Sequence, residues 1–127
     1  MKKINKTNIL LWILQIFLGI YFINIGLMHF ILPTNLPDFI NWMYDLPDTL
    51  HYFIGTLEIM AGLGLILPWL TKIQTRLTPI AGLGLVVLMI GAMIWHLQRG
   101  EPRNIIVCVI LAAFSGFISY GRWNVSR

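Results

Sequence analysis

Four long apolar windows constrain the fold of this chain more than any other feature. They cover roughly residues 8–32, 52–70, 77–98 and 105–120. Each is close to the roughly 20 residues with which a helix, rising about 1.5 Å per residue, crosses a hydrocarbon core about 30 Å thick. None shows the alternation of apolar and polar residues that membrane β-strands require. The sequence therefore predicts an all-α integral membrane protein, an antiparallel four-helix bundle.

The composition also favours a membrane protein. Hydrophobic residues make up 57% of the chain and charged residues only 11%, whereas a soluble domain carries about 25% charged residues. The windows use most of the 127 residues, so we expect residues 1–127 to form a single membrane domain. The apolar part of the first window, about 25 residues, is longer than the roughly 7–15 residues of a signal peptide. We therefore expect the first helix to be retained.

The distribution of basic residues predicts the orientation of the bundle. The two tails and the loop between the second and third helices carry Lys2, Lys3, Lys6, Lys72, Arg76, Arg122 and Arg127. The last loop has only Arg99 and Arg103, and the first loop, residues 33–51, has no basic residue. By the positive-inside rule both termini are expected to be cytoplasmic. Because topology explains the net positive charge, we do not read it as a sign of nucleic-acid binding.

The first loop, residues 33–51, is long and has an amphipathic character. Three prolines punctuate it, three aspartates make it acidic, and Phe39, Ile40 and Trp42 give it an apolar side. Such a segment can lie in the plane of the membrane interface. We expect a short interfacial helix here, placed over the outer mouth of the bundle as a lid or a lipid contact.

A polar cluster is expected in the outer half of the membrane. Glu58 is the only acidic residue in the second window and lies on one stripe with Gly55 and Gly62. Its depth, about 9 Å below the outer surface at about 1.5 Å per residue, is similar to that of His29 and His96. Acids at such positions are costly and commonly mark ion, proton or ligand sites. The three residues together predict a small polar pocket that opens outward.

The glycines of the first two helices indicate close packing. Gly19 and Gly26 share a stripe with His29 in the first helix, as Gly55 and Gly62 do with Glu58 in the second. Small residues on such stripes let helices approach closely in lipid. Glu58 is therefore expected to face the bundle interior.

Other interpretations of the polar residues remain open at this point. Glu58 could be a protonated acid with a purely structural role. His29 and His96 each lie close to the membrane interface, where a histidine requires no functional explanation. A metal site made of His29, Glu58 and His96 has plausible ligand types, but no local ligand spacing supports it. Cys108 is the only cysteine, so an internal disulfide or a CxxC redox pair is excluded.

Several motifs resemble those of a known family. GLMHFILP, GTLEIMAGLGLILP, GAMIWHLQRGEPRN and YGRW occur in the right order and spacing, over most of the chain. They resemble the DoxX-like family of small four-helix membrane proteins. The resemblance implies a bacterial inner-membrane protein linked to redox or sulfur metabolism, with thiosulfate oxidation and quinone reduction as family precedents. It carries over His29, Glu58 and His96 as candidate catalytic or ligand-binding residues, flanked by Arg99 and Glu101.

We expect a redox-associated membrane component in which a quinone hydrogen-bonds to His29 or His96 and exchanges protons through Glu58. A partner oxidoreductase subunit would have to supply any sulfur chemistry, and a homo-oligomer is also possible. Two alternatives stay open. The first is a non-enzymatic assembly or lipid-binding subunit, and the second is a small transporter or proton-conducting protein. Whether the chain is an enzyme is left undecided by the sequence.

Overall fold

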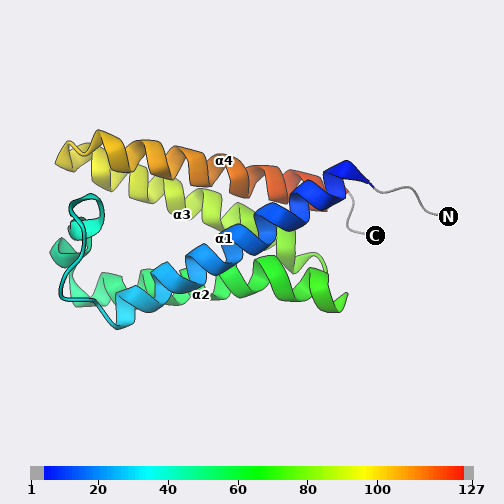
Figure 1. Cartoon of the computed structure of the whole chain (residues 1–127), viewed down its shortest axis with the longest axis horizontal. Coiled ribbons are helices and arrows are strands. Elements are labelled where there is room, and N and C mark those ends of the chain that lie inside the picture. Colours follow the sequence, from blue (N-terminus) through cyan, green and yellow to red (C-terminus); the bar gives the residue numbers. More distant parts are fainter. Residues whose placement is uncertain (1–4, 125–127) are drawn as a thin grey trace.

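The computed structural model describes residues 5–124, and these form four long helices and one short one. The long helices are α1 (Lys6–Phe30), α2 (Asp48–Thr71), α3 (Leu77–Arg99) and α4 (Pro102–Asn124), and the 3-10 helix η1 (Asp38–Asp45) lies between α1 and α2. The helices run up and down the bundle, so that η1 and the α3–α4 connection meet at one end, the loop end (Figure 1). The other end, which holds both termini of the described chain and the α2–α3 turn, is the terminal end.

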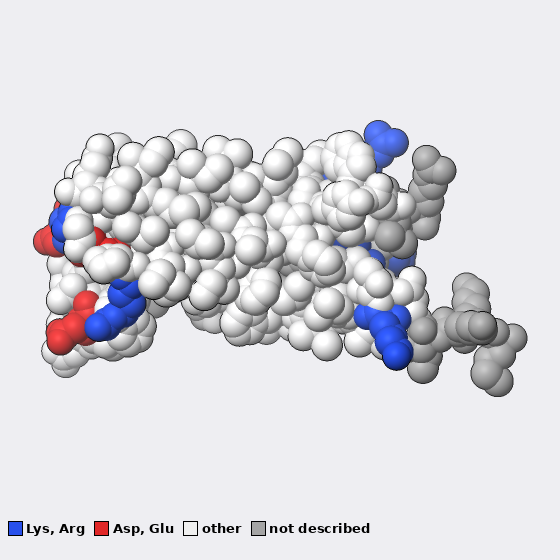
Figure 2. Space-filling model, turned by 90° about the horizontal axis from the view of Figure 1, so that it is seen from above, with Lys and Arg blue, Asp and Glu red and all other residues white. Residues whose placement is uncertain are grey.

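All four long helices are long and apolar enough to cross a membrane. Apolar side chains such as Ile13, Phe53 and Val87 are more than half exposed along the outside of the bundle, where lipid tails are the fitting solvent. In the face seen in Figure 2, charged side chains gather at the two ends and leave an uncharged belt between them. The chain is therefore a multi-pass membrane protein, as the hydropathy predicts.

The helices extend further into polar sequence than the apolar windows indicate. α2 begins at Asp48 rather than near residue 52, since Pro47 precedes it and Asp48 adds an acidic side chain to its first turn, which the helix dipole favours. α4 begins at Pro102, a residue suited to the first helical position. At its other end α4 continues to Asn124, four residues past the predicted end. Arg122 consequently belongs to a helix and not to a tail.

Some of the basic residues that predict the orientation of the bundle lie outside the part of the chain that the structure describes. Lys2, Lys3 and Arg127 fall outside residues 5–124. In the first loop, the predicted short helix is present as the 3-10 helix η1, whose Met43 is fully buried. Leu46 just after it is also buried. The loop thus packs onto the end of the bundle through its apolar side, as its amphipathic pattern predicts.

α1 and α2 touch backbone to backbone at two levels. A Cβ atom on Gly26 would lie 2.9 Å from the carbonyl oxygen of Gly55, and one on Gly62 would lie 2.7 Å from that of Gly19. No side chain larger than hydrogen fits at such distances, and Gly55 and Gly19 have equally close neighbours. The predicted close packing is therefore used inside the chain, where it holds α1 against α2.

Gly62→Ala is expected to lower the thermal stability of the protein in detergent. The new Cβ would meet the Gly19 carbonyl oxygen and Ile23 Cγ1, both at 2.7 Å, and overpacking of this kind costs about 1–3 kcal/mol. Gly84→Ala is the matched control, because nothing lies within 4 Å of its added Cβ and alanine gains about 0.5–1 kcal/mol of helix propensity. Equal unfolding midpoints for the two variants would contradict the close α1–α2 contact.

Candidate functional site

Three buried polar side chains, those of His51, His29 and Glu58, contact one another in series near the loop end. His29 Nδ1 lies 2.8 Å from His51 Nδ1, and His29 Nε2 lies 3.1 Å from Glu58 Oε1. The exposed fractions of His29, His51 and Glu58 are 4%, 5% and 4%. Within residues 5–124 Glu58 Oε1 has no hydrogen-bond partner, since the contact with His29 has the distance of an ion pair but not the angle of a hydrogen bond. His29 therefore connects the two other groups.

The helix geometry explains why these residues meet. His51 and Glu58 are seven residues apart in α2, two turns of the helix, so their side chains share one face. His29 is in the last turn of α1, three residues beyond Gly26 on the same stripe. Because Gly26 packs directly on the backbone of Gly55, α1 comes close enough to α2 for the imidazole of His29 to reach both partners.

The hydrogen-bond chemistry of this chain allows two proton arrangements. In the first, Glu58 is a carboxylate facing the Nε2–H group of His29, and the Nδ1–H group of His51 donates to Nδ1 of His29. In the second, Glu58 is a carboxylic acid whose O–H group faces His29 Nε2, and His29 Nδ1–H donates to His51. Passing from the first to the second takes up one proton at His51 Nε2 and leaves one on Glu58. The arrangement is thus suited to carry a proton between His51 and Glu58.

His96, which the sequence places in the same pocket, lies in a neighbouring network. Its Nδ1 is 2.8 Å from Glu101 Oε1, and Arg99 Nε donates to the same oxygen over 3.0 Å. The indole ring of Trp42 lies between the two groups, with ring centroids 6.5 Å from His29 and 5.0 Å from His96. The structure therefore brings His29 and Glu58 together and pairs His96 with Glu101 instead.

A left-handed turn places Glu101 against His96. Gly100 has φ of 68°, a conformation that glycine adopts without strain. The backbone N–H groups of Gly100 and Glu101 donate to Leu97 O and His96 O, at 3.2 Å and 3.1 Å, which is the common closing pattern of a helix. The chain folds back so that the carboxylate of Glu101 reaches the last turn of α3. Glu101 is therefore the acidic partner that His96 contacts.

Arg99 fastens η1 to the end of α3. Its Nη2 atom donates to Asp45 Oδ2 over 2.6 Å, and its Nε and Nη2 atoms also contact the carboxylate of Glu101. The guanidinium carbon of Arg99 lies 4.5 Å from the ring centroid of Trp95. Trp42 of η1 lies beside His29 and the backbone of Met43 lies beside His51, so this ion pair holds η1 next to the buried histidines. We call Arg99, Asp45 and Glu101 the latch.

The pKa of Glu101 is lowered, first by the hydrogen bond from Arg99 and then by that from His96. A carboxylate with a lowered folded-state pKa stabilises the folded state above its unfolded pKa, and this contribution is lost as the pH falls through the folded value. We expect the thermal midpoint of the wild type to fall more steeply below about pH 4.3 than that of Glu101→Gln. Parallel curves for the two proteins would contradict the latch as a source of stability.

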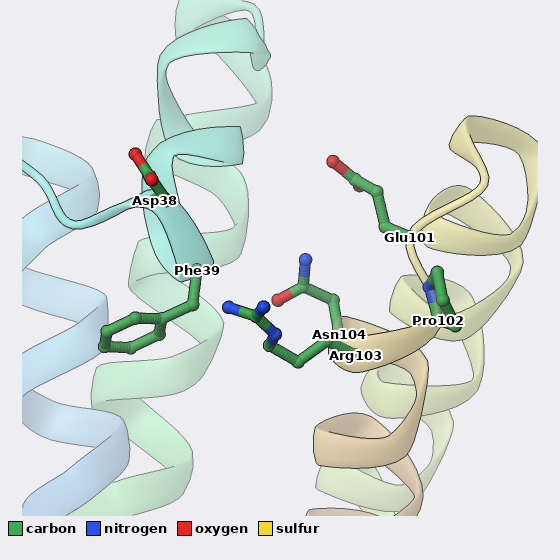
Figure 3. Close-up of a pocket in the computed structure, with 6 residues that line it drawn as sticks. All are labelled: Asp38, Phe39, Glu101, Pro102, Arg103 and Asn104. Carbon is green, nitrogen blue, oxygen red and sulfur yellow. The ribbon is translucent and has the colours of Figure 1, made fainter.

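A pocket of about 310 Å³ lies beside the latch, between η1 and the start of α4. It is lined by Asp38, Phe39, Glu101, Pro102, Arg103 and Asn104. Figure 3 shows the guanidinium of Arg103 extending from α4 toward the ring of Phe39 on η1. Among the described residues, no group of three or more His, Cys, Asp and Glu side chains is arranged to hold a metal ion. The pocket therefore offers mixed charges and an aromatic face rather than a metal-ligand set.

The comparisons with known proteins agree with the motifs in the sequence. The model of the DoxX-like family matches residues 13–118. The chain belongs to the DoxX-like family. Comparison with curated proteins and with solved structures found no match. The family match spans His29, His51, Glu58, His96 and Glu101, so the loop-end groups lie within the part that defines this DoxX-like chain, whereas Arg122 lies beyond it.

Sequence reasoning missed two members of the buried polar groups. His51 and Glu58 are seven residues apart, and this spacing in the sequence indicates that they share one helix face. Hydropathy assigns Arg122 to the C-terminal tail, but its side chain is fully buried and donates to the side chain of Gln15. The signal here was Gln15, a polar residue deep in the first apolar window. Gln15 also donates to Leu65 O over 2.7 Å, so its amide links α1 to α2 as well as to Arg122.

Proposed function

We propose that this DoxX-like protein is a redox-associated membrane component whose His51–His29–Glu58 chain exchanges protons with a ligand at the loop end. The observation that carries the proposal is the continuous contact from His51 through His29 to Glu58, at 2.8 Å and 3.1 Å. Three titratable side chains buried in one contact series are costly in a membrane. A role in moving protons is a physical reason for their presence.

Each residue has a distinct role in this proposal. His51 lies in the first turn of α2 at the loop end and takes up or releases the proton on that side. His29 passes it on, because an imidazole can accept at one nitrogen while it donates at the other. Glu58 holds the proton at the inner end of the chain. The latch and Trp42 cover the histidines, which limits competing proton exchange with water.

Within residues 5–124, a quinone fits the unsatisfied acceptor of the His51–His29–Glu58 series, which is Glu58 Oε1. Glu58 Oε1 is buried without a hydrogen-bond partner among the described residues, and the hydroxyl group of a hydroquinone is a donor of the kind it requires. Glu58 and His29 are the residues that would hold the head group. When bound, a quinone would supply two-electron, two-proton redox chemistry. Glu58 and His29 would provide the site for its protons.

The orientation is part of the proposal. We place the loop end on the extracytoplasmic side of a bacterial inner membrane. Asp38, Asp45 and Glu101 are there with Arg99 and Arg103, whereas the terminal end has Lys6, Lys72 and Arg76 and no acidic residue. Basic residues favour the cytoplasmic side. His51, at the outer end of the His51–His29–Glu58 series, then lies toward the extracytoplasmic side.

The glycine faces favour this proposal over an assembly subunit. Gly19, Gly26, Gly55 and Gly62 are occupied by contacts between α1 and α2 of the same chain. They are therefore not free to pack against a partner. A role in assembly would have to use other surfaces.

The experiment is a titration of the detergent-purified full chain with a short-chain benzoquinone, followed by quenching of tryptophan fluorescence. Trp42 lies next to His29, so a ligand there quenches it. We expect saturable quenching in the wild type and at least about ten-fold weaker binding in Glu58→Gln, a difference of about 1.4 kcal/mol. Trp42→Phe should remove most of the quenching and so locate the ligand.

Asp38→Asn is the matched control, because it also removes one negative charge from the loop end but alters an exposed residue. It should bind the quinone like the wild type. A wild type without saturable quenching, or equal affinities for the wild type and Glu58→Gln, would contradict the proposal. The first of these results would favour the non-enzymatic assembly role.

A further inference from the structure

A second buried polar group lies at the terminal end, far from the proton chain. At its centre is Arg122, in the last turn of α4, with an exposed fraction of 0%. Its Nε atom donates to Gln15 Oε1, and its Nη1 atom donates to Asn8 Oδ1 over 2.7 Å. The guanidinium carbon lies 4.2 Å from the ring centroid of Trp69 and 5.7 Å from that of Trp12. Side chains of α1 and α2 thus enclose a cation that belongs to α4.

No acidic side chain can balance this charge. The five acidic residues of the sequence are Asp38, Asp45, Asp48, Glu58 and Glu101. All lie toward the loop end, and Figure 2 shows the exposed ones gathered there. Glu58, the deepest, precedes Trp69 by eleven residues in α2, about 16 Å along the helix axis at about 1.5 Å per residue. Arg122 is therefore a buried cation without a side-chain counterion.

The guanidinium also has an unused donor. Within residues 5–124 its Nη2 atom is buried without a hydrogen-bond partner. The two partners that it has, the amide oxygens of Gln15 and Asn8, are neutral. A buried charge without an opposite charge is strongly destabilising, and adjacent guanidinium nitrogens form a fork that suits bidentate contact with a phosphate. Nη1 and Nη2 are such a pair.

A second cation lies on the same indole ring. Lys72 Nζ is 4.4 Å from the ring centroid of Trp69, and Lys72 is exposed. Asn8 and Trp12 are half-buried, so they form the rim between Arg122 and the surface. The amide of Asn8 holds the place at Nη1 that an anionic oxygen would take, and its rotation would open the guanidinium to a ligand.

We infer that Arg122 and Lys72 form a binding site for a phosphate-bearing anion at the terminal end of the bundle. The phosphate is held by the fork of Arg122, displaces the side chain of Asn8 from Nη1, and is attracted by the ammonium group of Lys72. The ligand chemistry has two sources, the head group of an anionic phospholipid and free phosphate. At the boundary of a membrane helix the head group is the more concentrated.

The test uses the delipidated full chain in a neutral detergent. Its thermal midpoint and its native mass spectrum are measured with phosphatidylglycerol, with phosphatidylcholine, and with sodium phosphate against sodium chloride of equal ionic strength. We expect phosphatidylglycerol to raise the midpoint and to bind at least about ten-fold more tightly than phosphatidylcholine, about 1.4 kcal/mol. Stabilisation by sodium phosphate alone would identify free phosphate as the source, and its absence would identify the lipid head group.

Three variants locate the site. Arg122→Gln should lose the preference for phosphatidylglycerol, and Lys72→Gln should weaken it by a few fold. Arg76→Gln is the matched control, because Arg76 is an exposed basic residue of the same turn, and it should bind like the wild type. Lys72 is exposed, so Lys72→Gln remains informative if Arg122→Gln does not fold. Equal binding of the two lipids by the wild type, or equal losses in Lys72→Gln and Arg76→Gln, would overturn the inference.

Discussion

His29→Leu is expected to destabilise the protein by about 3–5 kcal/mol, the cost of breaking a buried ion pair by removing one partner. His29 contacts both Glu58 and His51, so its loss leaves two buried polar groups without this partner. Glu58→Gln is expected to change the stability by about 1 kcal/mol or less, because the amide keeps a hydrogen-bonding group beside His29 and removes the need to bury a charge. Comparison of the two variants therefore distinguishes a structural role of the His29–Glu58 contact from a role in proton exchange.

Unfolding of both variants in detergent, followed by circular dichroism as a denaturing detergent is added, measures this difference. Asp38→Asn serves again as a control for loss of charge. If Glu58→Gln were as unstable as His29→Leu, the carboxylate would be a structural lock between α1 and α2, which is the alternative that the sequence leaves open.

Gln15→Leu is expected to destabilise the terminal end by about 1.5–3 kcal/mol, the range for a lost hydrogen bond to a charged group. The substitution takes an acceptor from the Nε atom of Arg122 and a donor from Leu65 O. The double variant Gln15→Leu/Arg122→Met should recover most of the loss, because it also removes the charge that Gln15 helps to solvate. The effects of the two substitutions on the free energy of unfolding are therefore expected to be strongly non-additive.

A double-mutant cycle in lipid-free detergent measures this interaction. Gln15→Leu, Arg122→Met and the double variant are compared with the wild type. Losses that add within about 0.5 kcal/mol would show that the two side chains do not act as a unit.

The helices were predictable from the sequence because lipid allows few alternatives. A membrane-spanning segment must satisfy its own backbone hydrogen bonds, so an apolar window of sufficient length predicts a helix. The ends were less predictable. Pro102 and Arg122 are not apolar, and hydropathy ends the window before such residues even where helical hydrogen bonding continues.

The candidate site was predictable only in part, for reasons that lie in the packing. Stripes and depth indicated that His29 and Glu58 lie at the same level, and the structure places them 3.1 Å apart. The same argument grouped His96 with them. It could not foresee that the turn at Gly100 brings Glu101 to His96, or that Trp42 of η1 enters between the histidines.

Arg122 shows the limit of the topology argument. A basic residue just after an apolar window is ordinarily assigned to the interface, where it contributes to orientation. Whether it is buried depends on how α1 crosses α4, and this depends on contacts such as that of Leu11 with Gly121. Such contacts between distant segments have no periodic signature in the sequence.

The central claim, that Glu58, His29 and His51 share protons as one unit, is tested most directly by NMR of protein labelled with ¹⁵N-histidine. The sequence has only three histidines, so single substitutions assign every ring nitrogen. We predict that Glu58→Gln shifts the ring nitrogens of both His29 and His51 and leaves those of His96 nearly unchanged. A shift confined to His29, or one as large at His96, would contradict the claim.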